Sequence, residues 1–158
     1  MARPTFVYVT YIRTTPVKLW SALTEAEFMR QYWFGMHCES RWTPGSPWQL
    51  LSDSGEVFDS GEIVEAEPPR RLVIRWHHQQ RAELHAEGAS LCTMELEPVG
   101  GAVQLRITHS IEREPSKLID AVSGGWPKVL SNLKSLLETG SVAVQEAYPS
   151  GASHAAQG

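Results

Sequence analysis

The 158-residue chain has few cysteines, no excess of one charge and no long hydrophobic run, and each absence narrows its class. Cys38 and Cys92 stand far apart without a CxxC motif, which favours two buried, reduced thiols over a disulfide or a metal site. A net charge of −4, with 14 scattered Lys and Arg, argues against a nucleic-acid or anionic-membrane surface. No apolar run approaches the ~18 residues of a membrane span. No apolar signal segment follows the first residues, so we expect a cytoplasmic protein.

Several enzyme motifs are also missing. No GxSxG, GxGxxG or Walker sequence occurs. The histidines show no metal-ligand spacing such as HxxxH, and the adjacent His77 and His78 would point to opposite faces of a strand. The segment 123–125, Ser-Gly-Gly, fits the start of a helix better than an oxyanion turn. We therefore expect no metal, no cofactor and no catalytic residue that the sequence alone identifies.

Aromatic and β-branched residues are plentiful, and their spacing predicts an α+β domain. Residues 6–12 predict a first strand. Two short helices should follow, one with Pro16 in its first turn and one over 25–31 with Thr24 as its N-cap. Between residues 36 and 111, short segments separated by Gly and Pro turns predict a meander of about six strands. The expected strands are 36–42, 47–51, 57–67, 72–78, 91–97 and 103–111.

The last third of the chain predicts the helix that lies on this sheet. Its apolar residues recur at steps of three and four, the pattern of an amphipathic helix. A Gly-Gly pair and Pro127 interrupt the pattern, so we expect a short helical turn over 115–122 and a main helix over 124–139, ended by a glycine. The expected organisation is a single domain over 1–140 and a flexible, patternless tail over 141–158.

Four segments together resemble a known superfamily. These segments are Tyr11–Thr24, Tyr32–Gly35, Pro68–Val73 and Gly124–Leu133. On them the chain is identified as START-like (SRPBCC) over residues 6–139, similar to bacterial proteins related to the activator of the heat-shock-protein ATPase (AHSA-type). The resemblance implies a helix-grip fold, with a curved antiparallel sheet of six to seven strands around the C-terminal helix and a hydrophobic pocket between them. Relatives bind lipids, polyketides and other apolar molecules; some are cyclases or aromatases, and others are co-chaperones.

Large flat side chains supply the first candidate ligand contacts. The chain has six Trp, and four of them fall on elements expected to line the pocket. They would present flat faces to an aromatic ligand, although each would equally fill a large core. The predicted ligand-binding residues are Trp33, Phe34, Trp48, Phe58, Ile74, Trp76, Met94, His109 and Trp126.

His109 is the polar member of this set. Alternation along 103–109 places it on the same face as Val103, Leu105 and Ile107, and therefore inside. An inward imidazole could donate to a ligand carbonyl or act as a general acid or base. The favoured alternative is a core histidine whose ring is satisfied by a neighbouring backbone or side-chain group.

Other polar residues give weaker candidates. Glu62, Glu65 and Glu67 could supply an inward acid, because a bulge expected near residues 60–61 breaks the alternation there. Such residues on an antiparallel sheet with one wet face are usually solvated, so we expect no catalytic role for them. Alternation also places His78 on the inward face of its strand.

These observations lead to one first hypothesis and two alternatives. The first is binding of an apolar small molecule, aromatic or lipid- or polyketide-like, between the sheet and the C-terminal helix. Each 100 Å² of apolar ligand surface that is buried contributes roughly 2.5 kcal/mol before association costs. The alternatives are a cyclase- or hydrolase-type enzyme that uses the same pocket, and a co-chaperone-like module. The last ranks lowest, because the family's chaperone activators carry an additional domain. We expect no nucleic-acid or membrane partner; a homodimer through the strand 6–12 and a chaperone partner remain open.

Overall fold

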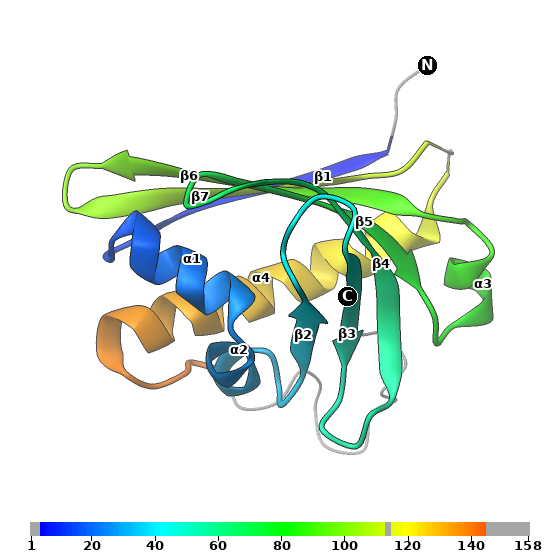
Figure 1. The fold of residues 1–158 in the computed structure, drawn as a ribbon, viewed down its shortest axis with the longest axis horizontal. Coiled ribbons are helices and arrows are strands. Elements are labelled where there is room, and N and C mark those ends of the chain that lie inside the picture. The colour runs from blue at the N-terminus through cyan, green and yellow to red at the C-terminus, as the bar shows by residue number, and fades with distance from the viewer. Residues whose placement is uncertain (1–3, 113–114, 145–158) are drawn as a thin grey trace.

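The computed structural model describes residues 4–112 and 115–144, which form one curved antiparallel sheet with helices against its concave side (Figure 1). Within these residues the sheet has seven strands in the order β1-β7-β6-β5-β4-β3-β2. The first strand therefore pairs with the last, and β1 and β2 are the two edges. The strands are β1 (Thr5–Ile12), β2 (His37–Ser40), β3 (Pro47–Leu51), β4 (Val57–Glu67), β5 (Arg71–His78), β6 (Ser90–Val99) and β7 (Ala102–Ser110).

The helices complete a two-layer arrangement. They are α1 (Pro16–Thr24), α2 (Ala26–Tyr32), α3 (Ala82–His85) and α4 (Lys117–Thr139). The long α4 runs beneath the sheet, α1 and α2 lie beside it, and α3 follows the end of β5 (Figure 1). The predicted α+β helix-grip fold is confirmed, and the polar segment between β5 and β6 contains the short α3.

Alternation along the strands decides which side chains form the core. On β7, His109 and the apolar residues of its parity are fully buried, while the residues between them are half-exposed. The inward position predicted for His109 is confirmed. The apolar side chains of this face pack against α4, so the core lies between the concave side of the sheet and the helices.

Gly61 allows close packing in the middle of the sheet. It pairs with Trp48 on β3 and with Trp76 on β5. A Cβ at this position would lie 1.7 Å from the carbonyl oxygen of Arg75. Only glycine fits there, and its missing side chain leaves the space above it to the two neighbouring indoles.

The bulge predicted near Ser60–Gly61 is wrong in its position. The register shifts at Leu50–Leu51 and again between Ile63 and Glu65. Pairing with β5 is regular between these points, so Asp59 shares the concave face with Gly61. The glycine signals close strand approach rather than a bulge.

The first two helices differ in how their starts are satisfied. Thr15 caps α1 with its hydroxyl, and Pro16 occupies the first turn, as predicted. The prediction that Thr24 caps the second helix is wrong. Glu25 takes that position without a side-chain hydrogen bond, and the Thr24 hydroxyl instead donates to the carbonyl of Trp20 at 2.8 Å.

The predicted break in the C-terminal helix is also wrong. α4 is continuous, with Pro127 inside it. It begins at Ser116, whose hydroxyl accepts from the N–H of Ile119 at 3.1 Å, and ends at the expected glycine, Gly140, with φ +90°. Packing of a long apolar stripe outweighs the one backbone hydrogen bond that proline removes. The stripe comprises Leu118, Ile119, Val122, Trp126, Val129, Leu130 and Leu133.

The predicted tail is described only over residues 141–144. There the side chain of Asn132 holds the backbone of Val144: Oδ1 accepts from the N–H at 2.7 Å, and Nδ2 donates to the carbonyl at 2.8 Å. The chain thus stays attached to α4 just past the expected boundary. Residues 145–158 lie outside the described residues, and the division into domain and tail stays a prediction.

Candidate functional site

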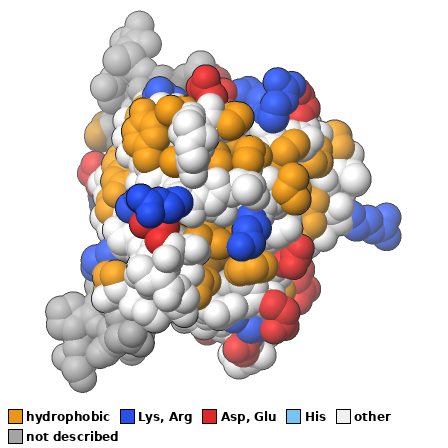
Figure 2. Space-filling model, turned by 90° about the vertical axis from the view of Figure 1, so that its left-hand side faces the viewer, with side chains coloured by type: hydrophobic (Ala, Val, Ile, Leu, Met, Phe, Trp, Pro, Cys, Tyr) orange, Lys and Arg blue, Asp and Glu red, His pale blue; other side chains and the backbone are white. Residues whose placement is uncertain are grey.

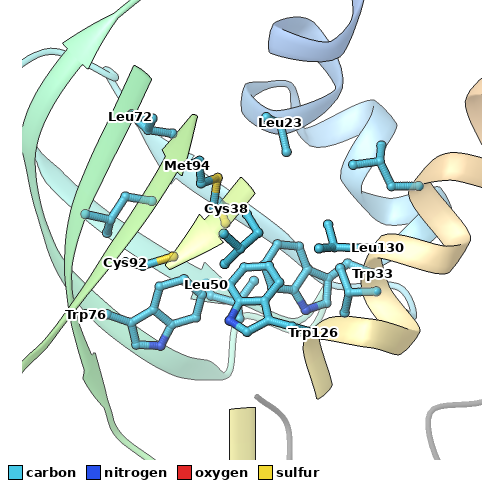
Figure 3. Close-up of a cluster of buried hydrophobic side chains, with 14 of the residues drawn as sticks. Leu23, Trp33, Cys38, Leu50, Leu72, Trp76, Cys92, Met94, Trp126 and Leu130 are labelled. Carbon is cyan, nitrogen blue, oxygen red and sulfur yellow. The ribbon is translucent and has the colours of Figure 1, made fainter. Parts of the chain in front are cut away.

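Four buried Trp side chains meet between the concave face and α4, three of them labelled in Figure 3. The ring centroids of Trp48 and Trp76 are 4.5 Å apart, across Gly61. Trp126 of α4 meets Trp76 edge-on at 5.7 Å, and Trp33 at the end of α2 lies 5.4 Å from Trp126. Contacts of this geometry add to the stability gained from burying the rings.

The other predicted contacts surround this Trp cluster. Ile74 and Met94 are buried on the same face of the sheet. Phe34 and Phe58 are half-buried and pack against the edge of the core. The structure therefore brings together in the core Trp33, Trp48, Ile74, Trp76, Met94, His109 and Trp126.

His109 is held in a closed chain of hydrogen bonds. The indole N–H of Trp126 donates to His109 Nδ1 at 3.2 Å. Nδ1 is therefore the acceptor, so Nε2 carries the proton and donates to Ser90 Oγ at 2.8 Å. The Ser90 hydroxyl in turn donates to the carbonyl of Trp76 at 3.1 Å. Burial lowers the pKa of His109 to about 3, so the ring is neutral near pH 7. This geometry matches the satisfied core histidine that the sequence favoured.

A second buried polar pair lies on β4 and β5. Asp59 and His78 are opposite each other in the register, are each 1% exposed, and join through Oδ1 and Nδ1 at 2.8 Å. Burial raises the pKa of the Asp59 carboxyl, against the opposing effect of its hydrogen bond with His78. The sequence placed His78 inward without a role and missed Asp59. Alternation traced back along β4 from Ile63 through Gly61 reaches Asp59, and this was the available signal.

Four side-chain atoms around this pair have no hydrogen-bond partner among the described residues: Asp59 Oδ2, His78 Nε2, Trp48 Nε1 and Trp76 Nε1. The Trp76 N–H faces the Asp59 carboxyl and lowers its pKa, but the two groups do not reach hydrogen-bond geometry. An unsatisfied buried polar group costs about 1–3 kcal/mol. A small group with both donor and acceptor capacity would relieve part of this cost.

The three glutamates considered as inward acids lie on the outer face. Each is about half exposed and forms an ion pair with an arginine of β5 or of the turn before it, and solvated pairs of this kind contribute little to stability. The sequence interpretation of these residues as solvated agrees with this position. The pairs are Glu62–Arg75, Glu65–Arg71 and Glu67–Arg70, at 3.0, 3.1 and 3.1 Å.

Among residues 4–112 and 115–144, no group of three or more His, Cys, Asp or Glu side chains could hold a metal ion. Cys38 and Cys92 are free and buried, and burial raises the pKa of both thiols. None of the described helices is both long and apolar enough to cross a membrane.

Solved structures place this fold among known ones. Protein MLL2253 from Mesorhizobium loti is 26% identical, with a TM-score of 0.72 over 85% of this chain and 96% of that one. DynU16, a protein in the dynemicin biosynthetic locus, is 22% identical with a TM-score of 0.71, over 88% of this chain and 49% of DynU16. The Aha1 dimer from Colwellia psychrerythraea is 19% identical with a TM-score of 0.70, over 86% of this chain and 97% of that one. The last two likenesses show the fold alone.

Sequence comparison gives the family. The comparison with curated proteins finds no match. The family model described as activator of Hsp90 ATPase homolog 1-like protein matches residues 13–138, which include the helices α1 and α2, nearly all of α4 and every strand except β1. The chain therefore belongs to the activator of Hsp90 ATPase homolog 1-like (AHSA1) family, within the START-like fold.

Proposed function

We propose that this protein binds an apolar small molecule, aromatic or lipid- or polyketide-like, in its interior between the concave face of the sheet and α4. The observation that carries the proposal is the set of unpartnered polar atoms beside the Trp cluster. Mostly apolar surroundings with a few convergent polar groups are typical of small-molecule sites. A ligand that buries apolar surface there and supplies hydrogen-bond partners would stabilise the folded chain.

The proposal is consistent with the family relation. The similar DynU16 belongs to a locus for biosynthesis of a small molecule, dynemicin. For this chain the ligand would remain bound by packing, with the buried Trp rings as its main contacts. A cytoplasmic location, expected from the sequence, is part of the proposal.

Native mass spectrometry and a thermal-shift screen test the proposal. Freshly purified protein should carry a co-purifying mass, or aromatic and polyketide-like compounds should raise its melting temperature. Ligand at 100 times its Kd stabilises the folded state by about 2.7 kcal/mol. The same compounds should quench Trp fluorescence. Quenching should weaken in Trp126→Phe and persist in the control Trp20→Phe, since Trp20 lies on α1 and only partly against the core. No bound mass and no shift across a broad panel would overturn the proposal.

Interaction with a chaperone is the second candidate function. One end of the molecule carries the β6–β7 hairpin and the start of α1, and Figure 2 shows hydrophobic side chains gathered there with charged ones around them. Three exposed apolar residues belong to elements that begin or end in this region: Tyr11, Val17 and Val99, which are 49%, 68% and 45% exposed. Exposed apolar surface with a polar border is typical of protein-binding sites.

An ATPase assay distinguishes this candidate from ligand binding. If the role is co-chaperone-like, the purified chain should change the turnover of an Hsp90-type ATPase without any small ligand. Val17→Glu should reduce that effect, because it places a charge on the apolar end. Ala82→Glu, at an exposed position of α3 on the opposite side of the molecule (Figure 1), is the matched control. An unchanged ATPase rate would exclude the chaperone role.

A second copy of this chain is the partner that the β1 edge favours. The carbonyl of Tyr11 accepts from Lys134 on the side away from β7, so alternate residues of β1 direct their backbone groups to that open edge. Val7 and Val9 share this direction, and their side chains are 47% and 38% exposed. Charged side chains usually protect an edge strand from pairing with another chain, and the strand Thr5–Ile12 has none. The similar protein from Colwellia psychrerythraea is a dimer.

Light scattering after size-exclusion chromatography tests antiparallel β1–β1 pairing. The unmodified chain should elute with the mass of a dimer, and Val9→Lys should give a monomer. Val99→Lys, an equally exposed valine at the end of β6, should leave the dimer intact. A monomeric unmodified chain at high micromolar concentration would contradict this partner.

A further inference from the structure

We infer that Asp59, His78 and the Trp76 indole form the polar end of the proposed site and select ligands that carry a hydroxyl group on an aromatic ring. The inference rests on the proposed binding function and assigns the part of it that the Trp cluster leaves open, the chemistry of the ligand's polar group.

The sheet register brings these three side chains together. Asp59 is opposite His78, and Gly61, two residues along β4, is opposite Trp76. Residues two apart on a strand point to the same face, about 6.6 Å from each other. Two rows of residues therefore run across the strands next to each other. One row holds the indoles of Trp48 and Trp76 on either side of Gly61, which has no side chain; the other holds the Asp59 carboxyl and the His78 imidazole.

The open atoms define what a ligand must supply. Asp59 Oδ1 is taken by His78, while Oδ2 is open and, in the ionised carboxylate, requires a donor. The indole N–H of Trp76 is open and requires an acceptor, because an indole nitrogen only donates, whereas the Trp48 indole is directed to the Cys38 thiol. A hydroxyl group does both with one oxygen: it donates its proton toward Oδ2 and accepts from an indole.

Other polar groups satisfy only part of this set. A ketone or ether oxygen would accept from an indole but would set its lone pairs against Oδ2. An ammonium group would donate to Oδ2 but would leave the Trp76 N–H without an acceptor. Trp48 and Trp76 are also only 4.5 Å apart, too close to enclose a cation between their rings as an aromatic cage would.

The remainder of the surroundings explains why the hydroxyl belongs on an aromatic ring. Next to the polar rows the concave face presents Leu50, Ile74 and Met94, all buried. His109, the buried histidine of β7, has both ring nitrogens engaged by the protein and offers no second polar contact. A flat apolar ligand with one hydroxyl matches one polar end and an otherwise apolar interior.

Calorimetric titration with matched naphthalene probes tests the inference. The probes are 2-naphthol, 2-methoxynaphthalene, 2-methylnaphthalene and 2-naphthylmethylamine. The unmodified protein should bind 2-naphthol at least tenfold more tightly than 2-methoxynaphthalene. Asp59→Asn replaces the carboxylate by a neutral amide, which has one acceptor oxygen in place of two. Trp76→Phe removes the indole N–H but keeps an aromatic ring. Each should reduce the preference to about threefold or less, with affinity for 2-methylnaphthalene nearly unchanged.

His77→Gln is the control for both variants, because His77 is on the same strand but is half-exposed and faces the other way. It should keep the full preference for 2-naphthol. Circular dichroism checks the fold of each variant, and Trp76→Phe carries the test if Asp59→Asn does not fold.

The possible outcomes separate the two proposals. If 2-methylnaphthalene binds and 2-naphthol binds no more tightly, the hydroxyl inference is overturned while the binding function stands. Tightest binding of the amine also overturns it, in favour of a cationic ligand. If none of the probes binds, and the broader ligand screen is also negative, both proposals fail. A preference for 2-naphthol that persists in both variants places the hydroxyl elsewhere and overturns the assignment of residues.

Discussion

His109 and His78 are two buried histidines on the same concave face, but their surroundings differ in one respect. Both nitrogens of His109 have partners, supplied by Trp126 and by Ser90. His78 has a partner only at Nδ1, and its Nε2 has none among the described residues. The first ring is thus part of a closed network, and the second is part of an open one.

The difference separates a structural role from a candidate binding role. A closed network stabilises one conformation of the core, since every buried polar group in it is satisfied. An open network leaves part of the polar burial cost in place, which natural proteins tolerate mainly where a ligand or water completes it. Residue type and strand parity are the same in both cases, so only hydrogen-bond accounting distinguishes them.

The largest expected effect comes from a substitution in the sheet that carries both networks. Gly61→Ala places a Cβ against the Arg75 carbonyl, so β4 and β5 must separate. We expect a loss of about 4 kcal/mol or more in the free energy of unfolding, measured by urea denaturation. Gly124→Ala is the control, because a Cβ there meets nothing within 4 Å and alanine favours a helix by about 1 kcal/mol. Equal stability of the Gly61 variant and the unmodified chain would contradict the close approach.

The next largest loss of stability is expected from a substitution in the closed network. His109→Leu keeps much of the volume but leaves the Trp126 N–H buried without its acceptor. The expected loss in the free energy of unfolding is about 2–3 kcal/mol. The matched comparison is His85→Leu on α3, an exposed residue that loses one hydrogen bond to the His78 carbonyl and a ring contact with His77, so a smaller loss of about 1 kcal/mol is expected. A loss at His109 no greater than at His85 would show that the network contributes nothing.

The pH dependence of stability sharpens the comparison. The pKa of His109 is about 3 in the folded chain against about 6.5 when unfolded, so below pH 6.5 the unfolded state binds the proton and is favoured. As the pH is lowered, the free energy of unfolding should therefore decrease by at most about 1.4 kcal/mol per pH unit, or by about 3 kcal/mol between pH 6.5 and pH 4. Urea denaturation across this range should show a shallower fall in His109→Gln. Parallel curves would mean that His109 does not contribute.

Asp59 should act in the opposite direction. Because its pKa is raised in the folded chain, its contribution to stability is present below the unfolded pKa and is lost as pH rises through the folded pKa. Removing the charge by Asp59→Asn should thus leave the free energy of unfolding at pH 7 unchanged or increase it. A loss of several kcal/mol in urea denaturation would make the open pair as structural as the closed one.

Much of the fold follows from the sequence because periodicity is a direct consequence of burial. The strand meander, the long terminal helix and the inward face of His109 were all predicted from alternation or from steps of three and four. The continuity of α4 was not, because Gly and Pro lower helix propensity locally while the stabilising contacts come from the sheet. Propensity acts within a turn, and packing acts along the entire helix.

The candidate site was predicted only in its apolar part. Trp side chains are large and apolar and are usually buried, so the cluster could be expected from residue type and strand position. Asp59 was not ranked above the other acids, because the bulge expected near residues 60–61 would have broken the alternation that links it to Ile63. Hydrogen-bond partners depend on registers between strands, which residue spacing within one strand does not contain.

The two thiols have a kinetic consequence. Cys38 is on β2, an edge strand of the sheet, and Cys92 is on the inner strand β6; both thiols are shielded from solvent, and burial raises the pKa of both. Alkylation requires an exposed thiolate, so a reagent can modify either cysteine only while the sheet and helices have separated. The labelling rates therefore measure two different openings. Cys38 reports the release of the edge strand β2, and Cys92 reports the exposure of the inner part of the sheet.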